Sequence, residues 1–307
     1  MVVVNAKIIV VCRSKAAYVL DDEPKRIALT KQRSRKQPPI SPRYLLYIDI
    51  LNFAALASAD RKKVDQIYRI LDSLNAHRHP NFKAIAFSDT ILIYNPEPAT
   101  SKDDAEYLVW YLIEFAEDLH HRFTGQDLFF RAVLVAGDFT HYKLDHVECF
   151  FGEALIDAYL KEKSLPAIGL FISNECNGLN KYFRTARFDD KLSFVYLNRS
   201  LESLHNFSGD AYPIQYPGVA DEAPDVPWQV EFLKAIYRSM RDHPQSSVRA
   251  KYLATWDFYM RRYPGMLAAL TAGDFDLSSL AGKGAWRDES AAMAEDIKAF
   301  ASIDEET

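Results

Sequence analysis

Apolar runs that end in a carboxylate are the clearest pattern in the first third of the chain. Residues 44–48 are apolar or aromatic and lead directly to Asp49, as expected of a strand buried on both faces with a functional group at its end. Two further, largely apolar runs, 82–87 and 90–94, enclose the pair Ser88–Asp89. This arrangement predicts a β-hairpin with an aspartate in its turn, and adjacent strands would bring the two aspartates together.

The rest of the chain shows further helical and strand patterns. Helices are predicted at 64–74, 106–122, 153–163, 228–242 and 246–262. Strands are predicted at 129–137, 147–152, 168–172 and 192–197. His141, Tyr142 and Lys143 fall in a predicted loop. The order of elements favours an α/β or α+β sheet with helices covering one face.

Changes in composition divide the chain into four segments. Residues 1–42 form an N-terminal extension, with one or two possible strands and a basic, proline-ended linker at 31–39. Residues 43–211 carry the predicted sheet. Several prolines then introduce a helical region at 212–272. Residues 273–307 form an acidic tail rich in small residues, which we expect to be partly mobile.

The overall composition is that of a globular protein, since 49% of the 307 residues are hydrophobic and 26% are charged. A net charge of −5 argues against general binding of nucleic acid. Cys12, Cys149 and Cys176 form no CxxC pair, so neither a disulfide framework nor a zinc site is indicated. The first residues lack the features of a signal peptide, and no window matches a membrane helix. We therefore expect a cytoplasmic protein without membrane insertion.

Asp49 and Asp89 suit a hard divalent cation. Neither has a cysteine or histidine beside it in the sequence, and carboxylate oxygens favour Mg²⁺ or Mn²⁺ over softer metals. The alternative is structural, because aspartates at strand ends and in hairpins often stabilise the turn itself. The segments that follow each aspartate favour the first interpretation.

Four short segments, in order along the chain, resemble the signature of the class III nucleotidyl cyclases. The family has an Asp-Ile-x-Gly-Phe segment, a Gly-Asp hairpin, an Arg-x-Gly-Ile-x-x-Gly segment and a glycine that precedes a helix. The counterparts here are 49–53, Ser88–Asp89, 131–137 and 152–158. The resemblance covers about residues 43–200 and implies an α+β, ferredoxin-like cyclase domain, here with a C-terminal helical appendage.

The resemblance implies a two-metal site for a nucleoside triphosphate. Asp49 and Asp89, helped by the carbonyl of Ile50, would hold two Mn²⁺ or Mg²⁺ ions. The backbone N–H groups of Phe53 and Ala54, at the start of a helix, would bind the terminal phosphates.

The chain matches the family pattern at Arg131 and departs from it at four other positions. Arg131 corresponds to a phosphate-binding arginine, and the alternative is an ion-paired strand residue. Asn52 replaces a family glycine but tolerates left-handed backbone geometry, and Ser88 replaces another. The positions of the transition-state asparagine and arginine hold Ile156 and Leu160, neither of which donates a hydrogen bond.

The positions that select the base in this family are occupied by Ile85 and Cys149. Adenylate cyclases have lysine and aspartate there, and guanylate cyclases usually have glutamate and cysteine. Ile85 cannot hydrogen-bond the edge of a purine, and a site that leaves a polar edge unsatisfied rejects that base strongly. The resemblance therefore disfavours ATP and GTP as substrates.

Intact metal aspartates without purine-reading residues make the chain similar to the pyrimidine cyclases of bacterial antiphage (Pycsar) systems. Those enzymes make cyclic UMP or cyclic CMP, which activates a separate product-sensing effector. Segments 150–159 and 165–169 and the helical appendage share this similarity. Overall similarity to a uridylate cyclase favours UTP over CTP, although no single residue separates uracil from cytosine. Tyr47, on the same face of its strand as Asp49, is a candidate base contact, with a core tyrosine as the alternative.

The sequence is compatible with three functions. The first is a uridylate or cytidylate cyclase that produces the signal of an antiphage defence system. The second is a non-catalytic cyclase-fold module that binds nucleotide and regulates a partner, and the third is a relaxed purine cyclase.

Two expectations concern surfaces. Class III sites lie between two subunits, so the resemblance implies a head-to-tail homodimer with active sites at the interface. The apolar helix 106–122 is consistent with a partner face. His120 and His121 are adjacent on a helix and so face different directions, and we interpret them as surface residues and not as metal ligands.

Overall fold

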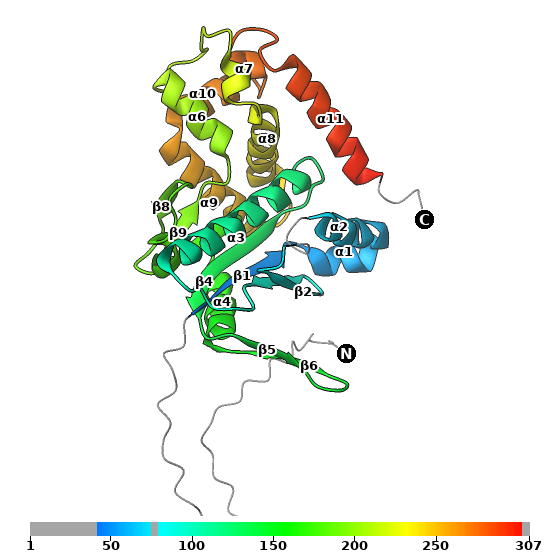
Figure 1. The fold of residues 1–307 in the computed structure, drawn as a ribbon. Coiled ribbons are helices and arrows are strands. Elements are labelled where there is room, and N and C mark those ends of the chain that lie inside the picture. Colours follow the sequence, from blue (N-terminus) through cyan, green and yellow to red (C-terminus); the bar gives the residue numbers. More distant parts are fainter. Residues whose placement is uncertain (1–41, 75–78, 303–307) are drawn as a thin grey trace, which may run out of the picture. The chain divides into compact units, whose positions relative to one another are not determined.

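The computed structural model describes residues 42–74 and 79–302. The predicted N-terminal extension and its basic linker lie outside this range, apart from Pro42. The remainder consists of a central sheet, the helices packed on its two faces, and a C-terminal set of helices (Figure 1).

The sheet has seven strands in the order β2-β3-β1-β4-β7-β9-β8. The strands are β1 (Arg43–Ile50), β2 (Lys83–Phe87), β3 (Thr90–Tyr94), β4 (Phe130–Gly137), β7 (Gly169–Ser173), β8 (Thr185–Arg187) and β9 (Leu192–Val195). The sequence predicts all of these except β8, which is short and half polar.

The first four strands form a ferredoxin-like unit. Between β1 and β2 lie α1 (Phe53–Ala59) and α2 (Arg61–Ser73), and between β3 and β4 lies α3 (Lys102–Phe123). The order β2-β3-β1-β4, with antiparallel neighbours throughout, is that of a βαββαβ unit. The predicted α+β, ferredoxin-like fold is therefore confirmed by the strand order itself.

A separate two-stranded ribbon follows the ferredoxin-like unit. It pairs β5 (Thr140–Lys143) with β6 (Glu148–Phe151), and it leads to α4 (Glu153–Ser164). The prediction of a loop at His141, Tyr142 and Lys143 is wrong, because these residues form strand β5. Polar and apolar side chains do not alternate in this segment as they do in a half-buried strand, so hydrophobic periodicity gives no signal for β5.

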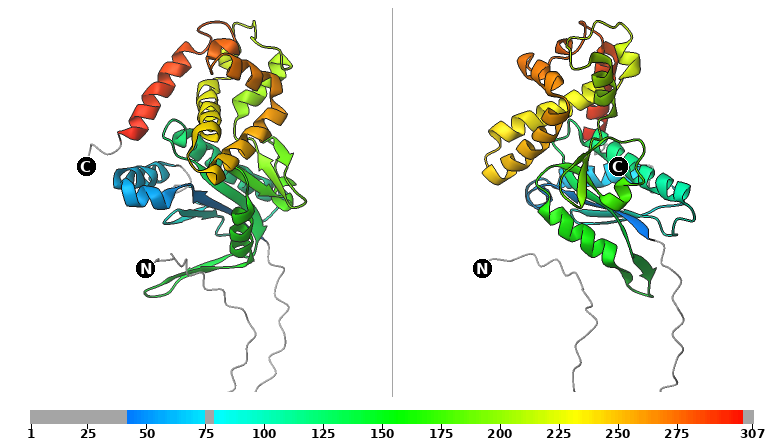
Figure 2. Two further views of the ribbon diagram at one scale, coloured as in Figure 1. Left: turned by 180° about the vertical axis from the view of Figure 1, so that it is seen from behind. Right: turned by 90° about the vertical axis from the view of Figure 1, so that its left-hand side faces the viewer.

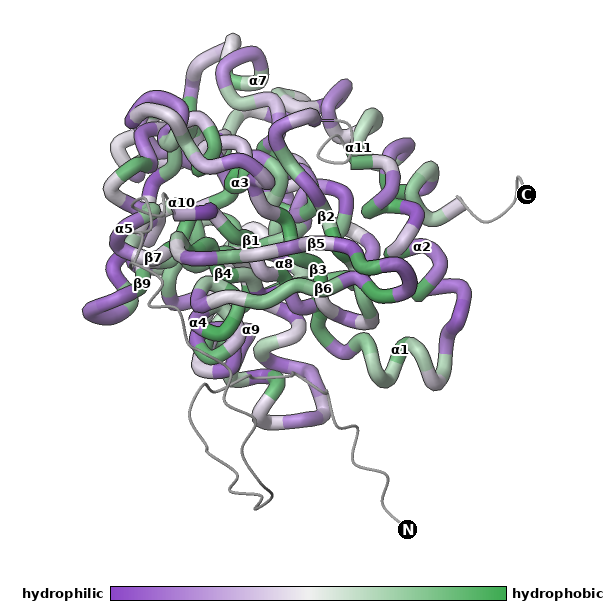
Figure 3. The backbone as a smooth tube through the Cα atoms, turned by 60° about the horizontal axis from the view of Figure 1, so that its bottom comes forward, coloured by the Kyte–Doolittle hydropathy of each residue, from purple (hydrophilic) through white to green (hydrophobic). Residues whose placement is uncertain are grey.

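Helices cover both faces of the sheet, so the prediction of one covered face is also wrong. Side chains of β1 alternate between two cores: Leu45 and Tyr47 join one, and Leu46 and Ile48 join the other. Helices α2 and α3 cover the second core (Figure 1). Helix α4 and the C-terminal helices cover the first, which faces the viewer in the left view of Figure 2. The most hydrophobic stretches of the chain lie in these central strands (Figure 3).

After β9 the chain is almost entirely helical. Its elements are α6 (Arg199–Ser208), α7 (Val219–Glu222), α8 (Val226–Asp242), α9 (Ser246–Arg262), α10 (Pro264–Ala272), a 3₁₀ helix (Leu277–Ser279) and α11 (Arg287–Ala301), and the short α5 (Asn174–Asn177) lies between β7 and β8. The sequence predicts α8 and α9 closely. Helix α11 occupies the segment for which we expected a partly mobile tail, and the buried indole of Trp286 precedes it and donates to the carbonyl of Ala223 at 2.9 Å.

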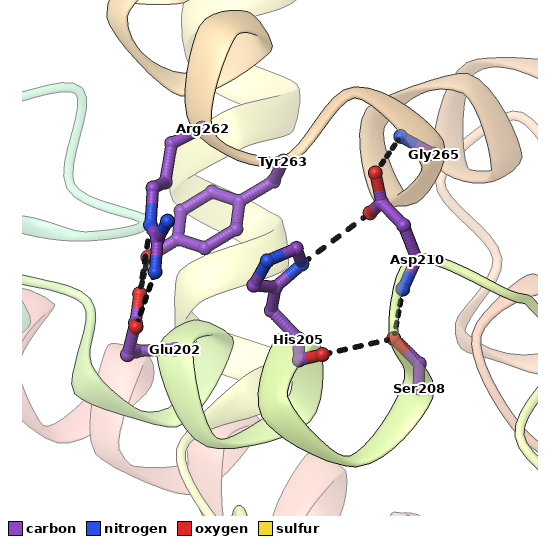
Figure 4. A network of polar contacts seen from close by, with 7 residues as sticks. All are labelled: Glu202, His205, Ser208, Asp210, Arg262, Tyr263 and Gly265. Carbon is purple, nitrogen blue, oxygen red and sulfur yellow. Dashed lines mark hydrogen bonds and ion pairs between the residues drawn. The ribbon is translucent and has the colours of Figure 1, made fainter.

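A polar network fastens α6 to the junction of α9 and α10 (Figure 4). The guanidinium of Arg262 and the hydroxyl of Tyr263 both donate to the carboxylate of Glu202. Asp210 accepts from the backbone N–H of Gly265 at 3.0 Å and lies beside His205. These contacts hold the end of α9 in place relative to the last part of the sheet domain.

His120 and His121 do not lie on an open surface, contrary to prediction. The ring of His120 lies 4.3 Å from that of Phe232, and the ring of His121 stacks on Trp228 at 4.9 Å. Both partners belong to α8, so this end of α3 is covered by the C-terminal region. Within the described residues no helix combines the length and apolar character needed to cross a membrane.

Helix α9 is fastened to the sheet by a buried threonine, and this contact gives a testable prediction. The hydroxyl of Thr255 accepts from the backbone N–H of Ile168 at 2.8 Å, and Thr255 is fully buried. Thr255→Val leaves that N–H without an acceptor, so we expect the free energy of unfolding to fall by about 1–3 kcal/mol. Urea denaturation measures it, and Thr271→Val, whose hydroxyl donates only to carbonyls of its own helix, should change stability by less than about 0.5 kcal/mol.

The burial of His120 predicts a pH dependence of stability. Burial lowers the pKa of His120 to about 4. In the unfolded chain the imidazole of His120 is protonated below about pH 6.5, whereas in the folded chain it stays neutral down to about pH 4. The free energy of unfolding therefore falls as the pH falls through this window. Between about pH 6.5 and about pH 5 the loss amounts to up to about 2 kcal/mol. His120→Gln should show a correspondingly shallower pH dependence in urea denaturation, and equal slopes for both proteins would contradict the assignment.

Candidate active site

The structure brings the two predicted metal aspartates to the same edge of the sheet. Asp49 pairs in register with Thr90, the residue that follows Asp89. The backbone N–H of Ile50 donates to the carbonyl of Asp89 at 2.8 Å. Phe87 pairs with Thr90, so Ser88 and Asp89 form the predicted two-residue turn. The hairpin and the convergence of its turn with the end of β1 are therefore confirmed.

Left-handed backbone geometry occurs at both positions where the chain departs from a family glycine. Asn52 has φ 61° and caps α1, and Ser88 has φ 54°. Asparagine adopts this region at moderate cost, whereas serine does so less readily. The turn at Ser88 is also held from α2, because the hydroxyl of Tyr68 donates to the carbonyl of Ser88 at 2.9 Å.

Arg131 lies between two carboxylates. Its Nη2 is 3.4 Å from Oδ2 of Asp49 and forms a close ion pair with Oε1 of Glu162 on α4. Its Nη1 is 3.5 Å from the carbonyl of Leu165. The side chains of Arg131, Asp49 and Glu162 are 13%, 14% and 2% exposed. In the free protein Arg131 thus makes the ion pair that was the alternative to a phosphate contact.

Glu162 is a site residue that the sequence analysis missed. A signal was present, because Ala154, Ala158 and Glu162 follow one another at intervals of four residues, which places them on one face of a helix. The two alanines of this face are buried in the core. A glutamate on a buried helix face needs a cation, and Arg131 supplies it.

The residues predicted to contact the base are divided between two places. Tyr47 is buried, its ring lies 6.5 Å from that of Tyr159, and its hydroxyl lies 3.5 Å from Oγ1 of Thr90. Leu92 pairs with Tyr47 on one side and with Ile85 on the other. These three side chains therefore form one row on the face of the sheet that also carries Asp49.

Cys149 does not join this row. It pairs with Tyr142 in the ribbon, and its interaction with Tyr142 raises the pKa of that tyrosine. Phe150, the next residue, points to the opposite side of the ribbon, where its ring lies 6.0 Å from that of Phe87. Within one chain, Cys149 and Ile85 are thus not brought together as a base-selecting pair.

The donor set at the sheet edge fits Mg²⁺ or Mn²⁺. Two carboxylates, from Asp49 and Asp89, lie with the carbonyl of Ile50 at one corner, and all these donors are oxygens. Such a set is incomplete by itself, as is usual for a cation that retains water and substrate phosphates as further ligands. Arg131 would keep Glu162 as its ion-pair partner if Asp49 held a metal. In the described part of the chain, no group of three or more His, Cys, Asp or Glu side chains is arranged to hold a metal.

The first residues of α1 offer backbone donors beside the aspartates. The helix begins at Phe53, directly after the left-handed Asn52, and no side chain caps it. The first N–H groups of a helix have no acceptor within the helix. Those of Phe53 and Ala54 therefore can bind an anion near the end of β1.

A cavity of about 440 Å³ lies elsewhere, between α3, the β9–α6 connection and α8. Its lining includes Glu117, Asn198, Arg199 and Trp228. None of the residues predicted for the nucleotide site lines it.

Comparisons with known proteins find similar solved structures only. No protein-family model matches the chain, and no curated protein matches it. The adenylyl cyclase CyaB from P. aeruginosa is 14% identical, with 50% of this chain and 93% of that chain covered and a TM-score of 0.38. The guanylate cyclase domain of RhGC from Catenaria anguillulae, solved with GTP, is 15% identical, with 51% and 96% covered and a TM-score of 0.39. A rhodopsin-guanylyl cyclase core with converted specificity, solved with ATPαS, is 18% identical, with 50% and 94% covered and a TM-score of 0.39.

The ion pair between Glu162 and Arg131 yields a prediction for stability. Glu162→Ala leaves part of a buried guanidinium without its closest carboxylate, so the free energy of unfolding should fall by about 3 kcal/mol. Glu153→Ala, at an exposed position in the first turn of the same helix, should cost less than about 1 kcal/mol. Chemical denaturation of both variants measures the free energy of unfolding. An equal decrease in the two variants would show that the buried ion pair does not contribute more to stability than an exposed glutamate.

Proposed function

We propose that the protein is a pyrimidine nucleotide cyclase that converts UTP to 3′,5′-cyclic UMP and pyrophosphate. The observation that carries the proposal is the meeting of Asp49 and Asp89 at one edge of a ferredoxin-like sheet. Oxygen donors for hard cations, backbone donors for phosphates and a face free of purine-reading side chains lie around this point.

The proposed reaction is intramolecular. The 3′ oxygen of the ribose forms a bond to the α-phosphorus, the bond from that phosphorus to the β-phosphate bridging oxygen breaks, and the 3′ hydroxyl proton passes to solvent. Two divalent cations held by Asp49, Asp89 and the Ile50 carbonyl would supply Lewis-acid activation and charge neutralisation. The N–H groups of Phe53 and Ala54 bind the terminal phosphates. Arg131, held by Glu162, stabilises the negative charge of the phosphates.

The preference for a pyrimidine rests on Ile85, the half-buried member of the row, because Leu92 is fully buried in the core. Ile85 has no polar side-chain atom, so a purine edge placed against it would lose its hydrogen bonds. Tyr47 is the only member of the row with a hydroxyl and is proposed as a base contact from its place on the face of Asp49, whereas its burial fits the alternative, a core tyrosine. UTP is preferred over CTP on the sequence resemblance alone, and cytidylate cyclase is the nearest alternative.

Exposed apolar side chains support a homodimer with the active sites at its interface. Ile156 and Leu160 on α4 are 40% and 61% exposed, and Tyr142 and Phe151 on the ribbon are 45% and 50% exposed. Exposed apolar side chains of this kind favour burial by a partner, and a second copy would also bring the Cys149 ribbon towards another subunit. Most apolar side chains of α3 are buried within the chain, whereas Tyr107 at its start is 38% exposed.

The biological role proposed for this activity is that of a cytoplasmic signal-producing enzyme in antiphage defence. Its product would act on a separate effector that senses the cyclic nucleotide. This role rests on the sequence resemblance to the Pycsar cyclases.

A second candidate function has its own support in the structure. Arg131 is already engaged by Asp49 and Glu162, and hydrophobic Ile156 and Leu160 stand where the family has transition-state donors. Both features fit a non-catalytic module that binds a triphosphate and regulates a partner.

Incubation with each of the four ribonucleoside triphosphates and Mn²⁺, followed by mass spectrometry, tests the proposal. We expect cyclic UMP from UTP, and a loss of roughly a hundredfold or more in Asp49→Asn and Asp89→Asn, because each removes a ligand of the catalytic cations. Asp72→Asn, at an exposed position of α2, should retain full activity. Cyclic CMP would correct the base, cyclic AMP or GMP would refute the pyrimidine preference, and triphosphate binding without any product would favour the regulatory module.

A further inference from the structure

Helix α9 of the C-terminal region lies against the same end of the sheet as the candidate site. The hydroxyl of Thr255 accepts from the N–H of Ile168, the residue just before β7, and Gly169 pairs in register with Arg131. The ring of Tyr252 lies 5.3 Å from that of Phe129. The carbonyl of Phe129 accepts from Leu51, two residues after Asp49. Two independent contacts thus place the first half of α9 beside the ends of β1 and β4.

Lys251 is the basic residue that this packing brings to the site. It precedes Thr255 by four residues, which places both side chains on one face of the helix. It is half-buried. Burial lowers the pKa of Lys251, and Arg131, Glu162 and Asp49 all lie within electrostatic range of its ammonium group.

The two cationic side chains of this region, Arg131 and Lys251, differ in their ion pairs. Arg131 is ion-paired with both Asp49 and Glu162. Lys251 has no carboxylate within ion-pair distance among the described residues, although it is drawn out of water. Partial burial of an ammonium group without such a partner is costly, and an anionic ligand in the site would offset that cost.

We propose that Lys251 binds the triphosphate of the substrate, which makes the C-terminal helical region part of the active site. The inference rests on the proposed function for the identity of the substrate. The ammonium group acts as a point charge on a flexible stem and so can reach a phosphate without the fixed geometry that a guanidinium requires. Arg131 then keeps its ion pair with Glu162, while Lys251 supplies a second cation for the triphosphate.

The test compares Lys251→Ala, Lys251→Arg and Arg261→Ala. Arg261 is an exposed cation on the same helix, paired with Asp257, and serves as the matched control. Binding of inorganic tripolyphosphate with Mn²⁺ is measured by calorimetry, and KM and kcat are measured with UTP. We expect Lys251→Ala to weaken tripolyphosphate binding and raise KM about tenfold, with kcat changed far less. Lys251→Arg should recover most of the loss and Arg261→Ala should behave as the parent protein. A purely structural role would alter the melting temperature and leave binding of the folded protein unchanged.

The outcomes separate this inference from the proposed function. Unchanged tripolyphosphate binding in Lys251→Ala, with the parent protein active on UTP, overturns the role of Lys251 and leaves the cyclase proposal standing. Binding that depends on Lys251 in a protein that makes no cyclic nucleotide supports the site and overturns the proposed reaction. A parent protein that neither binds tripolyphosphate nor turns over any triphosphate overturns both.

Discussion

The pairing of β1 along both of its edges is the constraint on which the rest of the structure depends. Antiparallel ladders to β3 and β4 remove any exposed edge from this strand, and its alternating side chains supply two separate cores. A strand covered on both faces can carry a charged group only at its end. Asp49 stands there, where the core meets the turn of the β2–β3 hairpin and the start of α1.

Electrostatic balance at this end of the sheet involves more of the chain than the two aspartates. Asp49 and Glu162 both form ion pairs with Arg131, and the turn that carries Asp89 lies beside the end of β1. Arg131 therefore balances the charge of two carboxylates near this corner, which is consistent with a site for positively charged ligands.

Local signals in the sequence predicted local structure well. The two-residue turn at Ser88–Asp89 and the left-handed Asn52 both follow from short-range chemistry. What the sequence did not reveal depends on pairing partners that periodicity does not identify. Polar β5 is a strand because the nearby β6 pairs with it. His120 is covered because α8, far along the chain, returns over α3. Glu162 joins the candidate site because the helix face that carries it meets Arg131.

The sharing of one core by the sheet and the C-terminal helices has a consequence for how this protein can be divided. Val133 of β4 and Phe171 of β7 bury against the same cluster as Leu233 of α8 and Tyr259 of α9. A shortened chain that ended after the last strand would expose that whole face to water and invite aggregation. The sheet of this protein therefore cannot be transplanted alone, and any fusion or recombination that preserves its fold must include the helices.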